Sequence, residues 1–165
     1  MRAALQIPYH YGMMDTWNRR MDMKVSTKGR YALRLMIDLA EHDRGDYIPL
    51  KEISARQNVS VKYLEQIVNQ LSRAGLLRSV RGAQGGYRLA KAPEDYTAGE
   101  ILRVTEGGLA PIACLSEAAK ACPRGGECET LDFWIGLAGV IDRYVDGVSL
   151  ADLVRQHQGK LNTRT

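Results

Sequence analysis

The chain has 165 residues and a net charge of +4, and its 45% hydrophobic and 25% charged residues are typical of an ordinary folded protein. No run of about 18 apolar residues occurs, and the first 22 residues lack the apolar segment of a secretory signal, which predicts a cytoplasmic protein without a membrane span. Residues 24–91 carry 13 basic and 6 acidic side chains, whereas residues 92–165 carry 7 and 11. The basic first part predicts contact with a polyanion, and an unevenly charged solvated surface is the alternative.

The organised part of the chain begins at Met23. Residues 1–22 show no apolar periodicity, and we interpret them as a disordered extension or as the result of a start codon placed upstream of the true one. The first predicted helix is capped by Ser26 or Thr27. Its apolar side chains recur at helical spacing, at Ala32, Leu35, Met36 and Leu39.

A helix-turn-helix and a hairpin are predicted next. The two helices lie at 50–57 and 61–73, and two short strands lie at 76–80 and 87–89 with a glycine-rich connection between them. Thr97 and Glu100 predict a capping box that opens one more helix. This order predicts a mainly α-helical winged helix-turn-helix over residues 23–106, with a small β-hairpin as the wing.

The predicted DNA-reading surface has two parts. On the helix at 61–73, Glu65 suits cytosine and Gln66 suits adenine, and the hairpin places Arg81 and Arg88 within reach of phosphates or the minor groove. The candidate contacts on the helix and its cap are Ser60, Lys62, Tyr63, Glu65, Gln66, Asn69 and Arg73. The alternative is an amphipathic helix pair with a solvated polar face. The glycine run matches no nucleotide-binding motif. Nothing else in the sequence resembles a substrate site, so we predict no small-molecule substrate and no enzyme.

All three cysteines of the chain lie in a segment rich in glycine and proline, predicted as a loop over residues 107–128. They are Cys114, Cys122 and Cys128. An odd number in a reducing compartment argues against disulfides. Thiolate clusters favour an iron–sulfur cluster, zinc or copper(I), although structural zinc prefers four ligands. Three surface thiols without a ligand are the remaining alternative.

The last predicted segment, residues 129–158, holds a long helix and a short terminal helix that begins at Ser149. The long helix has two apolar stripes, one made of Leu131, Trp134, Ile135, Ala138 and Val145, the other of Phe133, Leu137, Val140 and Tyr144. A helix that is apolar on two sides needs two partners. We predict that one side packs on the DNA-binding domain and the other on a second subunit, rather than both in one core. A homodimer predicts a pseudo-palindromic operator.

Three stretches of the sequence resemble the Rrf2 family of bacterial transcription regulators. They are MKVSTKGRYALR at 23–34, VSVKYLEQI at 59–67 and VRGAQGGY at 80–87, and the resemblance covers about residues 23–152. They are similar to the opening, the recognition helix and the wing of that family. The resemblance implies a dimer formed through the long helix, base discrimination by Glu65 and a wing contact by Arg81.

The resemblance also bears on the cysteines, because cluster-binding members of the family carry three cysteines in this loop. It implies an iron–sulfur cluster, 2Fe–2S or 4Fe–4S, held by Cys114, Cys122 and Cys128. Some members complete the site with a histidine where this chain has Leu131, and others with an acidic residue where this chain has Arg30. The fourth ligand therefore stays open among Glu117, Glu127, Glu129 and Asp132.

The combined prediction is a homodimeric repressor that binds double-stranded DNA with an affinity modulated by an iron–sulfur cluster. A zinc-dependent or thiol-redox regulator on the same scaffold is the first alternative. A small iron–sulfur electron carrier is the second, and it leaves the basic helix-turn-helix without a role.

Overall fold

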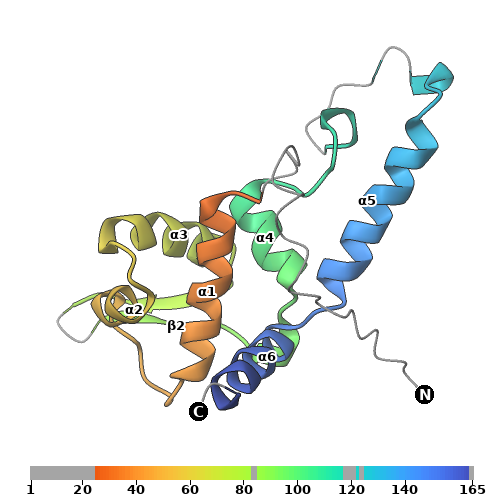
Figure 1. The fold of residues 1–165 in the computed structure, drawn as a ribbon. Helices are drawn as coiled ribbons and strands as arrows, with labels where there is room; N and C mark the ends of the chain where they lie inside the picture. Colours follow the sequence, from red (N-terminus) through yellow and green to blue (C-terminus); the bar gives the residue numbers. More distant parts are fainter. Residues whose placement is uncertain (1–24, 83–84, 117–121, 123–124, 164–165) are drawn as a thin grey trace.

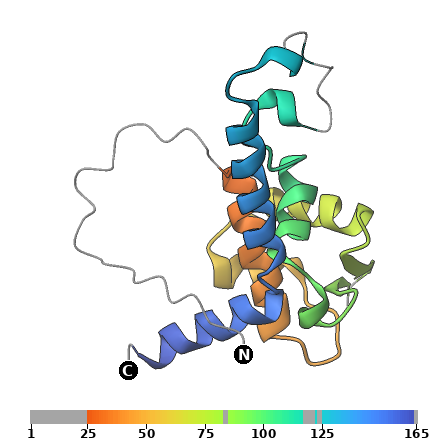
Figure 2. The same ribbon diagram turned by 90° about the vertical axis from the view of Figure 1, so that its right-hand side faces the viewer.

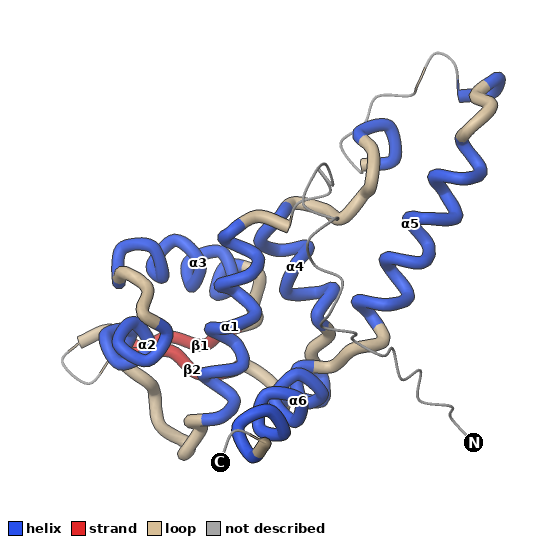
Figure 3. The backbone as a smooth tube through the Cα atoms, viewed as in Figure 1, coloured by secondary structure: helices blue, strands red, loops and turns tan. Residues whose placement is uncertain are grey.

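The computed structural model describes residues 25–82, 85–116, 122 and 125–163, and the predicted extension at 1–22 lies outside them. In the described residues the chain forms six α-helices and one two-stranded antiparallel sheet (Figures 1 and 3). The elements are α1 (Thr27–Glu41), α2 (Leu50–Gln57), α3 (Val61–Arg73), β1 (Leu77–Val80), β2 (Gly86–Leu89), α4 (Ala98–Glu106), α5 (Leu131–Asp146) and α6 (Leu150–Asn162). The predicted fold class, mainly α-helical with a small β-hairpin, is confirmed.

Side-chain caps start four of these helices, because a hydroxyl next to a helix start accepts from backbone N–H groups that have no partner in the first turn. The capping residues are Ser26, Ser60, Thr97 and Ser149. The predicted capping box at Thr97 forms only in half. Glu100 does not reach back to the cap; its carboxylate accepts from Lys91 at 2.9 Å. A tertiary ion pair has displaced a local contact.

One hydrophobic core unites α1, α3, α4, the hairpin and the start of α6. Its largest fully buried side chain is Tyr96, and burial raises the pKa of its phenol. The Tyr96 hydroxyl donates to the Leu76 carbonyl at 2.8 Å and accepts from the backbone N–H of Ala90 at 2.7 Å. Leu150, the first residue of α6, is also fully buried here, so the end of the chain returns to the N-terminal core.

The hairpin is tied to the segment before α2. β1 and β2 pair from Leu77 opposite Leu89 to Val80 opposite Gly86. On its other side β2 meets Ile48, with the two backbone hydrogen bonds between Ile48 and Tyr87 at 3.0 and 2.9 Å. A side chain at Gly86 would overlap with the Ile48 carbonyl, so this close approach requires glycine. The base of the wing is therefore held by the segment that leads into α2.

The last two helices differ in their surroundings. α5 stands beside α4 and apart from the core, and none of its 16 residues, all of them described, is buried (Figures 1 and 2). α6 lies against α1, begins with a complete capping box between Ser149 and Asp152, and is longer than the short helix expected. Nowhere in the described part of the chain is a helix long and apolar enough to cross a bilayer.

Candidate nucleic-acid interface and cysteine loop

Helix α3 separates a buried face from a polar face. Leu64, Ile67, Val68 and Leu71 are buried in the core. The opposite face is exposed and carries five of the predicted contacts, Lys62, Glu65, Gln66, Asn69 and Arg73, while Ser60 is exposed at the cap. Among the described residues, none of those five side chains has a hydrogen-bond or ion-pair partner. This face is therefore free to bind an external ligand along its whole length.

Tyr63 is placed differently from the other candidates on α3. It is half-buried, and its ring meets Tyr31 of α1 edge-on, with 5.9 Å between the ring centroids. The Arg34 guanidinium lies over Tyr31 at 5.0 Å. Arg34 also donates to the Gln57 side chain at 2.9 Å and to the Gln57 carbonyl at 2.8 Å, at the end of α2. Tyr63 thus contributes to the packing of α3 on α1, a role that the helical pattern did not indicate.

The two wing arginines are also not equivalent. Arg81 follows β1, is exposed, and has no partner in the described part of the chain. Arg88 is half-buried in β2, stacks over the Tyr47 ring at 4.7 Å and donates to the Gly45 carbonyl at 3.4 Å. Arg78, which sequence reasoning missed, is exposed and pairs with Arg88 across the hairpin. Positive charge on the wing is thus presented by Arg81 and Arg78 more than by Arg88.

An ion pair with a buried carboxylate joins α1 to α2. Asp38 of α1 is only 1% exposed, and it accepts from Arg56 at 2.7 Å and from the Gln57 amide at 2.8 Å. The hydrogen bond to Asp38 is the main reason why the pKa of Arg56 is raised. Because Gln57 directly precedes the turn into α3, this contact holds the end of α2 on α1 next to that turn. Sequence analysis missed it, and the only signal was an acidic residue on an apolar helix face.

All three cysteines of the loop are exposed. Cys114 lies in a single helical turn at Ala113–Leu115, and Cys122 and Cys128 flank a second turn at Gly125–Glu127. The Cys128 sulfur lies 3.7 Å from the Thr130 hydroxyl. The residues that the structure describes bring no three potential ligands together. Of the candidates for a fourth ligand, Glu127, Glu129 and Asp132 are exposed and Glu117 lies outside the described residues.

Helix α4, which leads into this loop, contacts both α1 and α5. Glu106 accepts from the Ser26 hydroxyl at 2.7 Å and from the Gly29 N–H at 3.0 Å, so the last residue of α4 caps α1. Arg103 of α4 donates to Asp142 and Asp146 near the C-terminal end of α5, both at 2.6 Å. These bonds raise the pKa of Arg103, and the bond from Arg103 is the main reason why the pKa of Asp146 is lowered.

The apolar residues of α5 divide into an exposed and a half-buried set. Leu131, Trp134, Ala138 and Val145 are half-buried, and so is Leu137, which the sequence pattern placed on the stripe of Phe133. Phe133, Val140 and Tyr144 are 66%, 53% and 63% exposed, and Ile135 is also exposed, although the sequence pattern placed it on the other stripe. Phe133, Val140 and Tyr144 recur at helical spacing and share one exposed face, whereas Ile135 lies on the opposite side of the helix. Large apolar side chains on one exposed helix face are typical of a protein contact surface.

Comparison with known proteins gives one consistent result. The profile of the Rrf2 family, described as an iron-dependent transcriptional regulator, matches residues 25–156. The chain is 38% identical to the transcriptional regulator IscR of Aliivibrio salmonicida over 80% of this chain and 77% of that one. It is 39% identical to the transcriptional regulator CymR of Bacillus subtilis over 84% and 94%.

Solved structures agree with the sequence relatives. CymR of B. subtilis, titled a global cysteine regulator, superposes with a TM-score of 0.65 at 39% identity, over 81% of this chain and 97% of that one. IscR of T. potens superposes with a TM-score of 0.64 at 39% identity, over 81% and 88%. The profile match spans most of the chain, and the fold is shared with these regulators. The chain therefore belongs to the Rrf2 family of transcriptional regulators.

Proposed function

We propose that this regulator binds double-stranded DNA in a sequence-specific way, as a homodimeric repressor acting on a pseudo-palindromic operator. One observation carries the proposal: the polar face of α3 is exposed and unpaired, and Arg81 of the wing is exposed as well. In a winged helix-turn-helix the second helix enters the major groove and the wing contacts the backbone or the minor groove. Such a protein is not an enzyme, and it works where the chromosome is, in the cytoplasm.

Two substitutions test the separate roles of the wing and of the recognition helix. Arg81→Ala should weaken binding to all DNA sequences alike and reduce the slope of log affinity against log salt by about one unit, because one phosphate contact is lost. Glu65→Ala should instead relax base preference, since the carboxylate discriminates cytosine. Fluorescence anisotropy with operator and scrambled DNA over a salt series measures both. An unchanged salt slope for Arg81→Ala, or a uniform loss for Glu65→Ala, would contradict these assignments.

We also propose that Cys114, Cys122 and Cys128 hold an iron–sulfur cluster. Three exposed thiols supply the donors that iron prefers, and the relatives named IscR and the iron-dependent description of the family support the proposal. Once bound, a cluster supplies a group that responds to oxidation or iron supply. A thiol-based sensor without metal is the second candidate, favoured by the equally similar CymR, which is titled a cysteine regulator.

We propose that a signal passes from the loop to the DNA-binding helix through Glu106 of α4. Rearrangement of the loop at Gly107, a residue with a positive φ of 77°, would pull on the adjacent Glu106. Glu106 caps α1, and α1 packs against α3 through Tyr31 and Tyr63. A change at the cysteines can therefore alter the position of the recognition helix.

Anaerobic purification separates the two sensing chemistries. We expect iron and sulfide in the native protein, their loss in Cys122→Ala, and an operator affinity that differs 5- to 150-fold between the loaded and the cluster-free protein. Ser116→Ala, in the same loop, is the control and should keep its iron. Iron-free protein whose operator affinity responds to oxidant would favour the thiol sensor, and stoichiometric zinc would favour the zinc alternative. Equal operator affinity of the cluster-loaded protein, the cluster-free protein and Cys122→Ala would rule out sensing at this loop.

A further inference from the structure

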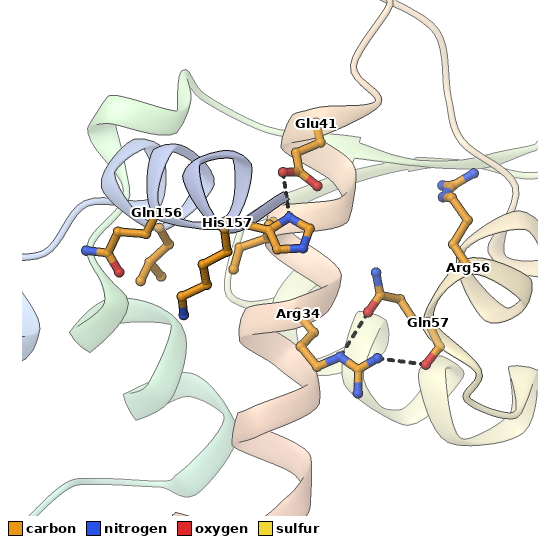
Figure 4. A pocket seen from close by; sticks show the side chains of 9 residues that line it. Arg34, Glu41, Arg56, Gln57, Gln156 and His157 are labelled. Atoms are coloured by element: carbon orange, nitrogen blue, oxygen red, sulfur yellow. Dashed lines mark hydrogen bonds and ion pairs between the residues drawn. The ribbon is translucent and has the colours of Figure 1, made fainter. Parts of the chain in front are cut away.

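A pocket of about 450 Å³ lies between α1, the end of α2 and α6 (Figure 4), and its lining includes no residue of α3 or of the cysteine loop. It is lined by Arg34, Ile37, Glu41, Arg56, Gln57, Leu153, Gln156, His157 and Lys160. Its volume falls in the range of sites that bind small molecules, about 300–1,000 Å³. None of the functions proposed above uses it.

The charges of the lining are unbalanced. Arg34, Arg56 and Lys160 are cations, whereas Glu41 is the single carboxylate in the lining. Glu41 is already engaged, since one of its oxygens lies 2.8 Å from the His157 ring, as Figure 4 shows. Arg56 is likewise engaged by Asp38 behind the pocket. The three cations outnumber the two carboxylates, Glu41 and Asp38, so an excess of positive charge remains at the pocket.

Several hydrogen-bond donors in the pocket are available. Lys160 and Gln156 have no partner among the described residues. Arg34 donates from Nε and Nη2 to Gln57, and its Nη1 makes no hydrogen bond with the described residues. Ile37 and Leu153 supply the apolar part of the lining. Cationic donors beside a small apolar surface complement a molecule with a carboxylate at the end of a short carbon chain.

We propose that this pocket binds a small organic carboxylate, with the carboxylate on Lys160 and Arg34 and the carbon chain against Ile37 and Leu153. The pocket joins helices from opposite ends of the chain, since α1 and α2 lie near its start and α6 near its end. α6 follows α5, and Gln57 lies directly before the turn that starts α3. A bound carboxylate would join the C-terminal helix to the base of the recognition helix.

Calorimetric titration of the full-length protein tests this with succinate, glutarate, glutamate and citrate. We expect saturable binding of at least one of them. The uncharged diamide of the same carbon skeleton should not bind, because it lacks the carboxylates. Inorganic phosphate should compete weakly, since it has no carbon chain to contact Ile37 and Leu153. Absence of binding by all four carboxylates, or equal binding of acid and diamide, would overturn the proposal.

Two matched variants locate the site. Lys160→Met should weaken carboxylate binding about tenfold or more, the loss expected for one charged hydrogen bond. Lys51→Met, an exposed lysine of α2 outside the pocket lining, should leave it unchanged. Lys160 is exposed and without a partner among the described residues, so its replacement leaves the fold intact. Equal losses in the two variants would show that net charge alone attracts the anion. Arg81→Ala, which is expected to weaken DNA binding, should bind the carboxylate with unchanged affinity. This variant therefore distinguishes a failure of the DNA-binding proposal from a failure of the carboxylate proposal.

Discussion

Val140→Asp is expected to convert the protein to a monomer and to lower operator affinity by about 10²–10⁴-fold. Val140 lies on the exposed face of α5, where Phe133 and Tyr144 are also largely exposed. A carboxylate buried in an apolar interface without a cationic partner is strongly unfavourable. A monomer contacts only one half-site, so the advantage of binding two linked half-sites is lost.

Two measurements distinguish loss of the dimer from damage to the DNA-binding surface. Sedimentation velocity measures the oligomeric state, and anisotropy with full-operator and half-site DNA measures affinity. Leu161→Asp is the matched control, because Leu161 is 52% exposed on α6 and receives the same charge. Half-site affinity of Val140→Asp should be unchanged. A dimeric Val140→Asp protein, or a loss of half-site affinity, would argue against α5 as the dimer contact.

Asp38→Ala is expected to lower the free energy of unfolding by about 3 kcal/mol, because it leaves the Arg56 guanidinium and the Gln57 amide without their shared acceptor. Removal of one partner of a buried ion pair costs about 3–5 kcal/mol. The Arg56 side chain is 28% exposed, so water relieves part of the loss and the lower end applies. This is a large share of the roughly 5–15 kcal/mol that stabilises a domain.

Urea denaturation followed by circular dichroism measures this effect. Asp46→Ala removes an exposed acidic residue nearby and should change the free energy of unfolding by less than about 0.5 kcal/mol. Arg56→Ala should destabilise as well, and the double variant by less than the sum, since both single changes break one interaction. If Asp38→Ala were no more destabilising than Asp46→Ala, the ion pair would not fix α2 on α1.

The contacts that escaped sequence analysis join residues far apart in the chain. Asp38 and Arg56 are 18 positions apart, and Glu106 and Ser26 are 80 apart, so no local pattern couples them. Glu100 is a case in which a local prediction failed. Its spacing from Thr97 predicted a capping box, but in the structure its carboxylate binds Lys91 instead. Local preference decides a polar contact only until a tertiary partner of opposite charge comes within reach.

Helix starts, the turn between α2 and α3, and the polar face of α3 followed from the sequence alone. Each depends on residues within one or two turns of one another, such as Ser60 and Tyr63, and hydrophobic periodicity defines the buried face. Only the tertiary structure decided which members of the predicted surface are available. It turned Tyr63 toward Tyr31, held Arg88 against Tyr47, and left Glu65 and Arg81 exposed. The pocket at Lys160 likewise exists only in the tertiary structure, because burial of Leu150 in the core brings α6 against α1. No single segment of the sequence indicates a long-range packing contact of this kind.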